Sequence, residues 1–170
     1  MIIKANKGKV GGMNDKVYTP VEVAKHIISY LPIKAGETLL EPCKGKGAFY
    51  DNFPADCSKD YCEIDEGKDF FEYNKKANWV ITNPPYSIFD AFVKHCFELS
   101  DNVVLLCPLS KVVSSLGRIK MLYDFGNPVE VQLVGASKCG FPFGFPCCAI
   151  WFKKDYRGKT EIKMMSIYEK

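Results

Sequence analysis

Apolar positions along the chain fall into two kinds of segment: short continuous runs, and longer stretches in which apolar and polar residues alternate with a helical period. The short runs are typical of strands inside a parallel sheet, and the longer stretches are typical of helices that cover such a sheet. Their alternation predicts an α/β domain with a mostly parallel sheet. The expected strands are 37–41, 60–64, 79–82, 103–107, 129–134 and 147–153, with a very short one at 69–71 and a further one at 160–168.

Three helices are expected, at 20–31, 88–99 and 112–125, together with a helical turn at 48–53. The first carries a start signal, because Thr19 and Glu22 have the spacing of a capping box and Pro20 suits the first helical position. Gly126 and Pro128 are expected to end the third helix.

With 170 residues, 47% of them hydrophobic and 25% charged, the chain has the size and composition of one globular domain. We expect residues 17–170 to form that domain, since the sequence shows neither an internal repeat nor a linker. Residues 1–16 are basic and rich in glycine, which predicts a flexible N-terminal segment. No apolar run has membrane-spanning length and no secretory signal is evident, so a cytoplasmic protein without a membrane partner is expected.

The eight cysteines require a choice between disulfides, a metal site and reduced core thiols. No Cys-x-x-Cys pair occurs and the two histidines lie far apart, so reduced thiols and no metal site are expected. Those expected in the core are Cys62, Cys96, Cys107, Cys147 and Cys148. The formal net charge of +3 is compatible with a nucleic-acid partner but does not indicate one.

The strongest candidate for a catalytic site is Asn83-Pro84-Pro85-Tyr86, which directly follows the strand at 79–82. Two successive prolines end a strand because neither donates a ladder hydrogen bond, and they hold the preceding residues in extended geometry. The sequence therefore predicts a stiff loop at the carboxyl end of a strand, where open α/β sheets bind ligands. An ordinary turn is the structural alternative.

Such a loop offers two fixed acceptors, the side-chain oxygen of Asn83 and the carbonyl oxygen of Pro84, beside the ring of Tyr86. An exocyclic aromatic amine is a poor nucleophile because its lone pair is delocalised into the ring. Two acceptors on its hydrogens favour the pyramidal form and lower the barrier to attack on a sulfonium methyl group. We expect Tyr86 to stack on a flipped base. Asn83, Pro84, Pro85 and Tyr86 are thus the predicted catalytic residues of an amino methyltransferase.

A second candidate site begins at Glu41, which leads into the turn Pro42-Cys43-Lys44-Gly45-Lys46-Gly47. Glycines after a strand let the backbone pass close to a ligand. A carboxylate there would repel pyrophosphate but suits the cationic ammonium group of S-adenosylmethionine (AdoMet). Glu63, at the end of the next strand, is a candidate for accepting ribose hydroxyls. A plain strand-to-helix turn and a solvated strand end are the alternative interpretations.

With these motifs in this order, residues 17 to 153 resemble the AdoMet-dependent adenine-specific (N6) DNA methyltransferases of the Asn-Pro-Pro-Tyr type. The resemblance implies methyl transfer from AdoMet to the exocyclic amine of a flipped adenine. It implies a Rossmann-like class I methyltransferase fold, with a seven-stranded mostly parallel sheet, an antiparallel terminal strand and helices on both faces. It also implies the cofactor-binding residues Tyr18, Thr19, Glu41, Pro42, Cys43, Gly45, Gly47, Glu63, Asp69, Phe70 and Asn83.

Two features depart from the family pattern. The family's target-recognition region is missing, which predicts a minimal enzyme that reads little sequence or relies on a partner such as a specificity subunit. In the loop 137–146, Phe141, Phe143 and Phe145 crowd together, and these rings either hold the flipped base or pack over the sheet edge.

Nucleic acid, with DNA favoured, is the expected partner, and a homo-oligomer is an alternative to a specificity subunit. The predicted nucleic-acid contacts are Lys111, Arg118, Lys138 and Phe143, with Lys120 on the same rim. A solvated face explains the basic residues equally well. The alternative activities are methylation of RNA adenine or of protein glutamine. An alternative of another class is a non-catalytic AdoMet-binding or nucleic-acid-binding subunit. By analogy, the small size indicates a phage, mobile-element or restriction-modification context.

Overall fold

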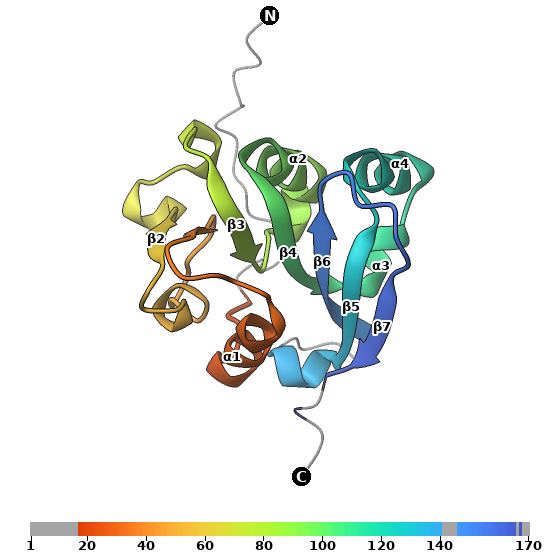
Figure 1. Cartoon of the computed structure of the whole chain (residues 1–170), viewed down its shortest axis with the longest axis horizontal. Helices are drawn as coiled ribbons and strands as arrows, with labels where there is room; N and C mark the ends of the chain where they lie inside the picture. The colour runs from red at the N-terminus through yellow and green to blue at the C-terminus, as the bar shows by residue number, and fades with distance from the viewer. Residues whose placement is uncertain (1–16, 141–145, 166, 168–170) are drawn as a thin grey trace, which may run out of the picture.

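The computed structural model describes residues 17–140, 146–165 and 167 (Figure 1). Its α-helices are α1 (Val21–Tyr30), α2 (Phe89–Leu99), α3 (Leu109–Val113) and α4 (Leu116–Phe125). Its strands are β1 (Thr38–Glu41), β2 (Ser58–Tyr61), β3 (Ala77–Thr82), β4 (Ser100–Pro108), β5 (Pro128–Gly135), β6 (Pro146–Lys153) and β7 (Glu161–Met164). Short 3₁₀ helices occupy Tyr50–Asn52, Ile64–Glu66, Phe70–Glu72, Tyr86–Ile88 and Ala136–Cys139.

The seven strands form one mixed sheet in the order β2-β1-β3-β4-β6-β5-β7. Strands β1 to β4 pair in parallel, and β6 runs antiparallel to both of its neighbours. The expected seven-stranded, mostly parallel sheet is therefore confirmed. Its antiparallel strand lies inside the sheet rather than at its edge, because β7 adds to β5 in parallel.

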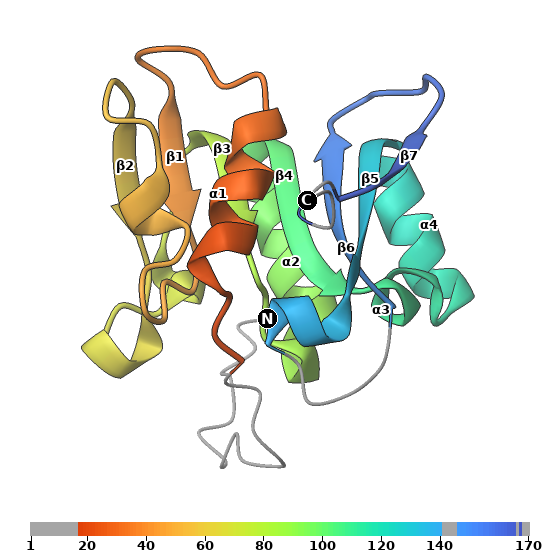
Figure 2. The ribbon, with the colours of Figure 1, turned by 90° about the horizontal axis from the view of Figure 1, so that it is seen from below.

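Helices cover both faces of the sheet, as Figure 2 shows: α1 lies on one face, and α2 and α4 lie on the other. Successive side chains of β4 point to opposite faces of the sheet, so this strand contributes to the hydrophobic core on each face. Val103 and Leu105 pack with α2, whereas Val104 and Leu106 pack with α1. This is why 103–107 reads as a continuous apolar run.

The capping box expected at the start of α1 is absent from the structure. Pro20 is the N-cap in extended geometry, and no side chain makes a capping hydrogen bond there. The Thr19 hydroxyl instead accepts a hydrogen bond from Asn83 Nδ2 at 3.2 Å. A contact across 64 positions of the chain thus replaces the local one.

Two further expectations are wrong in detail. Residues 69–71 form part of a 3₁₀ helix rather than a strand, because the Asp69 carboxylate accepts a hydrogen bond from Phe71 N at 2.9 Å and caps that turn. The single helix expected at 112–125 is two helices, since Ser115 is extended (φ −154°, ψ 153°) and its hydroxyl caps α4 by accepting from Arg118 N.

All eight cysteines are free thiols. The five expected in the core, Cys62, Cys96, Cys107, Cys147 and Cys148, are buried, as predicted. Within the described ranges, no helix combines the length and the apolar character that crossing a bilayer requires.

Candidate active site

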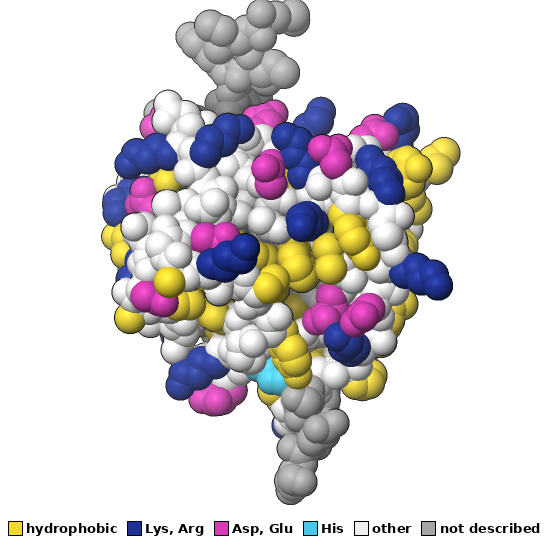
Figure 3. Space-filling view, in the orientation of Figure 1, with side chains coloured by type: hydrophobic (Ala, Val, Ile, Leu, Met, Phe, Trp, Pro, Cys, Tyr) yellow, Lys and Arg dark blue, Asp and Glu magenta, His cyan; other side chains and the backbone are white. Residues whose placement is uncertain are grey.

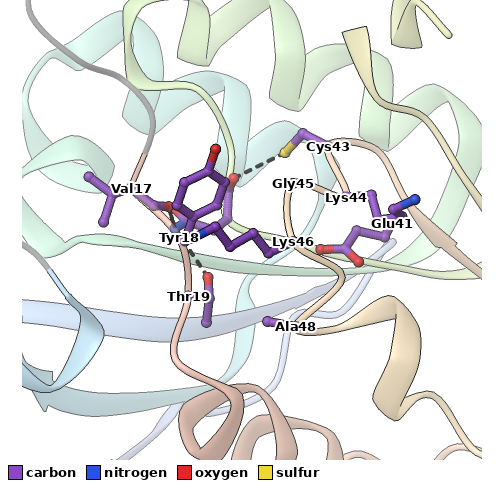
Figure 4. A pocket seen from close by; sticks show the side chains of 10 residues that line it. Val17, Tyr18, Thr19, Glu41, Cys43, Lys44, Gly45, Lys46 and Ala48 are labelled. Carbon is purple, nitrogen blue, oxygen red and sulfur yellow. Dashed lines mark hydrogen bonds between the residues drawn. The ribbon is translucent and has the colours of Figure 1, made fainter. Parts of the chain in front are cut away.

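A cleft opens at the carboxyl ends of β1 and β3, where the two candidate sites of the sequence meet. Its walls come from three segments: the residues before α1, the turn after β1, and the first residue after β3. The lining residues are Val17, Tyr18, Thr19, Glu41, Cys43, Lys44, Gly45, Lys46, Ala48 and Asn83 (Figure 4). The glycine-rich turn and the first residue of the Asn-Pro-Pro-Tyr loop therefore border one cleft.

The turn after β1 needs glycine at two positions. Gly45 (φ +53°) and Gly47 (φ +82°) lie in the left-handed region, which a side chain disfavours. Space is also restricted, because a Cβ on Gly45 would lie 3.3 Å from Tyr18 Cδ1, and one on Gly47 would lie 2.5 Å from Asp51 Oδ2. The backbone of the turn at Gly45, which carries no side chain, therefore packs against the ring of Tyr18.

Tyr18 and Lys46 form the wall opposite Glu41. Figure 4 shows the Tyr18 ring and the Lys46 chain side by side, and the Lys46 ammonium lies 4.5 Å from the ring centroid. Tyr18 packs against Gly45 on one face and remains 45% exposed.

Glu41 is a buried carboxylic acid, with only 2% of its surface exposed. Its Oε2 accepts a hydrogen bond of 2.6 Å from Tyr50 N. Burial raises the pKa of Glu41 to about 9, and this effect exceeds the opposing effect of the hydrogen bond from Tyr50. The side chain is therefore neutral at pH 7, and a cationic group placed beside it would favour its ionisation.

Glu63 is tied to the glycine-rich turn. Its Oε2 accepts from Gly45 N at 2.6 Å and its Oε1 accepts from Asp65 N at 3.1 Å. The Lys44 backbone N–H also donates to the Cys62 carbonyl oxygen at 2.9 Å, so the residue that follows β2 helps to fix the turn. Glu63 thus shapes the cleft, and its remaining lone pairs could accept ribose hydroxyls.

The Asp69-Phe70 pair lies outside this cleft. Asp69 caps its own 3₁₀ turn, and Phe70 is buried in the core, with its ring centroid 4.6 Å from that of Phe92. Neither Asp69 nor Phe70 is among the residues that line this cleft, and their predicted contact with the cofactor stays a prediction. Two apolar residues that the sequence analysis passed over, Ile64 and Phe71, are 66% and 47% exposed. In the sequence, the available sign was that an apolar residue, Ile64, directly follows the candidate Glu63.

Both ends of the Asn83 side-chain amide make hydrogen bonds, Nδ2 to the segment before α1 and Oδ1 to Tyr86. Asn83 Nδ2 donates to Val17 O and to Thr19 Oγ1, each at 3.2 Å. The Tyr86 hydroxyl donates to Asn83 Oδ1 at 2.7 Å and lies 3.3 Å from Leu106 O. Pro84 is buried and Pro85 is partly buried.

Tyr86 has a different environment from the one expected. Its ring packs against the core on the α2 face, and burial raises the pKa of its hydroxyl well above the ordinary value. In this conformation the Tyr86 side chain is only partly buried, and its stacking on a base stays a prediction.

Cys43 links the two loops of the site. Its thiol donates to Asn83 O at 3.0 Å, and its sulfur lies 2.9 Å from Thr82 Oγ1 (Figure 4 draws the first contact). Burial raises the pKa of this thiol, so it is protonated and serves as a hydrogen-bond donor.

The basic residues predicted to contact nucleic acid have mixed surroundings. Arg118 is committed to the fold: its guanidinium bonds Asp90, Lys111 O at 2.7 Å and Ser114 Oγ at 2.6 Å. Lys111 donates to Tyr86 O at 3.3 Å, beneath the candidate catalytic loop. Lys138 is exposed at the end of β5, in the 3₁₀ helix Ala136–Cys139. Phe143 lies outside the described residues.

Basic side chains do not gather into one field on the face drawn in Figure 3, where Lys and Arg are interspersed with Asp and Glu. On helix α4, Lys120 pairs with Asp124 one helical turn away at 2.8 Å. This mixture agrees with the small net charge of +3. Electrostatics alone therefore gives this face little preference for nucleic acid.

No family model matches the sequence, and no curated protein matches it either. Solved structures do resemble it. The methyltransferase subunit of a type I restriction-modification system from Streptococcus thermophilus has a TM-score of 0.67 and 20% identity, over 86% of this chain and 46% of that chain. The M protein of the type I restriction enzyme EcoKI has a TM-score of 0.60 and 12% identity, over 84% of this chain and 44% of that chain.

A third similar structure is magnesium protoporphyrin IX methyltransferase from Synechocystis, solved with bound AdoMet, with a TM-score of 0.60 and 14% identity over 79% of each chain. Together with the strand order, these similarities show that the chain has the Rossmann-like fold of class I methyltransferases. The chain spans less than half the length of the type I subunits that it matches.

Proposed function

We propose that this chain is an AdoMet-dependent methyltransferase that methylates the exocyclic amine of adenine in DNA. One observation carries the proposal: Asn83, the first residue of the Asn-Pro-Pro-Tyr loop, lines the same cleft as Glu41 and Gly45. An amide that can bind an amine and a carboxylate that can bind a cation thus border one space. The fold supports the proposal because it is shared with methyltransferases.

The chemistry of the cleft fits AdoMet. Glu41 is a buried carboxylic acid, and a cationic ammonium group beside it would compensate for the burial that raises its pKa to about 9. Gly45 leaves room where a Cβ would contact Tyr18. Glu63, fixed at the same turn, offers acceptors for ribose hydroxyls. AdoMet, when bound, supplies an electrophilic sulfonium methyl group.

The residues of the chain provide orientation and charge stabilisation. Asn83 Oδ1 and the Pro84 carbonyl oxygen would accept the two amine hydrogens and stabilise the positive charge that develops on the nitrogen. The Tyr86 hydroxyl now donates to Asn83 Oδ1, so the amine either displaces it or uses the second lone pair of that oxygen. The protein thereby provides positioned acceptors, which this reaction needs more than a strong base.

Recognition of the target sequence is proposed to come from a partner. The structures that this chain resembles include subunits of type I restriction-modification systems. On the face drawn in Figure 3, the Lys and Arg side chains of the described residues are interspersed with Asp and Glu. A specificity subunit that supplies base contacts and phosphate contacts would complete the site. The prediction of DNA as the acceptor remains part of the proposal.

The decisive experiment measures transfer of labelled methyl from AdoMet to duplex DNA, single-stranded DNA, RNA and protein, and identifies the modified atom. We expect N6-methyladenine in DNA; label in RNA or in a glutamine side chain would reassign the acceptor. AdoMet at a hundred times its dissociation constant should also stabilise the fold by about 2.7 kcal/mol. Absence of both stabilisation and transfer would favour a non-catalytic subunit.

The variant that tests the role of Asn83 is Asn83→Ala. It should keep AdoMet binding and lose about a hundredfold to a thousandfold in kcat, because one acceptor of the transition state is removed. Unchanged turnover would contradict the role assigned to Asn83.

A further inference from the structure

The Asn83 amide has one permitted orientation in this structure. The Val17 carbonyl oxygen, 3.2 Å away, can only accept a hydrogen bond, so the group facing it must be Nδ2. The reverse orientation would place Oδ1 against another acceptor. The same nitrogen donates its second hydrogen to Thr19 Oγ1 at 3.2 Å. Both amide hydrogens are therefore used by the segment that precedes α1.

This segment is itself fixed. Pro20 begins the helix turn by accepting from Ala24 N at 3.1 Å, and a Cβ on Gly140 would lie 3.2 Å from Tyr18 O. The 3₁₀ helix that ends at Cys139 thus closes against the backbone of Tyr18. Residues 17–19 provide a firm support for the Asn83 side chain.

The Thr19 hydroxyl is available for this contact because α1 does not use it. The N-cap of α1 is Pro20, and no side chain caps that helix. The hydroxyl lines the cleft beside Asn83, where it accepts from Nδ2. An apolar side chain of the same shape could fill the position but could not accept this hydrogen.

We propose that Thr19 is a positioning residue, which orients the Asn83 amide so that Oδ1 is the atom presented to the methyl acceptor. The inference rests on the proposed function for its kinetic consequence, but the hydrogen bond itself does not. Thr19 then contributes to the rate of transfer through Asn83, in addition to any contact with a cofactor.

The test compares Thr19→Val, which keeps the shape and removes the hydroxyl, with Thr19→Ser, which keeps the hydroxyl. Loss of one hydrogen bond should lower kcat of Thr19→Val about fivefold to tenfold at saturating AdoMet, in addition to any change in the AdoMet dissociation constant. Thr19→Ser should stay within about twofold of the natural protein. A Thr19→Val protein with unchanged kcat at saturating AdoMet would overturn the proposal.

A spectroscopic readout keeps this inference separate from the enzymatic one. The two Nδ2 protons of Asn83 can be followed by ¹⁵N–¹H correlation spectra of the ligand-free protein and assigned with Asn83→Ala. One of them should shift upfield in Thr19→Val and recover in Thr19→Ser. If no substrate is methylated, the function fails and the hydrogen bond is still tested. If the amide signals are the same in all three proteins, Thr19 does not position Asn83.

Discussion

The hydroxyl oxygen of Tyr86 lies 2.7 Å from Oδ1 of Asn83, and this contact closes the candidate catalytic loop on itself. The acceptor proposed for a substrate amine is thus already engaged by a donor from the same tetrapeptide. Burial of Tyr86 raises the pKa of its hydroxyl, so the group remains a donor over the whole physiological range. Substrate binding must compete with this internal hydrogen bond.

Replacing Tyr86 by Phe should therefore lower the KM for the methyl acceptor while largely preserving kcat. The ring keeps its packing, but Asn83 Oδ1 loses its internal partner. The variant should also unfold more easily, by about 1 kcal/mol, because a partly buried hydrogen bond is lost. Steady-state kinetics and thermal unfolding measure the two effects. A fall in kcat of more than about tenfold would show that the hydroxyl itself takes part in catalysis.

The pH dependence of stability should reveal the buried acid Glu41. Its pKa is raised from 4.5 to about 9, so the native state holds a proton that the unfolded chain releases. The contribution of this proton to stability is complete below about pH 4.5 and is lost as the pH rises towards about 9. The melting temperature of Glu41→Gln, measured relative to that of the natural protein, should rise steadily across this range. A difference independent of pH would mean that Glu41 is ionised in the native state.

The same carboxyl group predicts proton release on AdoMet binding. A cationic ammonium beside Glu41 would lower its pKa, so at pH 7 binding should liberate a proton. Calorimetric titrations in two buffers of different ionisation enthalpy measure this release. Glu41→Gln has no proton to lose there, so its binding enthalpy should be the same in both buffers. Equal enthalpies for the natural protein would argue against a Glu41–ammonium contact.

Gly45 and Gly67 provide a matched pair for the cleft. Both have positive φ, +53° and +75°, but a Cβ on Gly45 meets Tyr18 at 3.3 Å, whereas a Cβ on Gly67 has nothing within 4 Å. Either Gly→Ala change should destabilise the fold by about 1 kcal/mol through backbone strain. Only Gly45→Ala should also weaken AdoMet binding, by about tenfold, because the aromatic wall must shift. Equal affinities in the two variants would remove Gly45 from the cofactor site.

A variant of Lys111 can show whether this side chain contacts phosphate or supports the candidate catalytic loop. Its ammonium donates to Tyr86 O at 3.3 Å, so Lys111→Met should lower kcat about fivefold by loosening the loop. If Lys111 instead contacts phosphate, the variant would reduce the slope of log affinity against log salt by about one. Lys154→Met is the control, because the Lys154 ammonium pairs at 3.5 Å with Asp101, near the start of β4 and away from the loops at its carboxyl end. A reduced salt slope with unchanged kcat would restore the original prediction.

Sequence alone determined the parts of this protein that depend on local chemistry. Apolar runs with a two-residue or a helical period are recognisable without neighbours, so strand β4, helix α2 and the buried cysteines were placed correctly. The proline pair after Asn83 and the glycines after β1 are likewise visible in the sequence, and the structure places Gly45 and Gly47 in the left-handed region.

Tertiary structure decided which partner each polar group chose. Thr19 had a local use as a helix cap, yet its hydroxyl accepts from Asn83, and Arg118 joins α2, α3 and α4 instead of facing solvent. Phe70 and Phe71 are adjacent and alike in sequence, but the 3₁₀ turn buries one and exposes the other. Such choices depend on which distant groups the fold brings within about 3 Å, and hydrogen-bond energies fall steeply beyond that distance. No pattern along the chain contains that information.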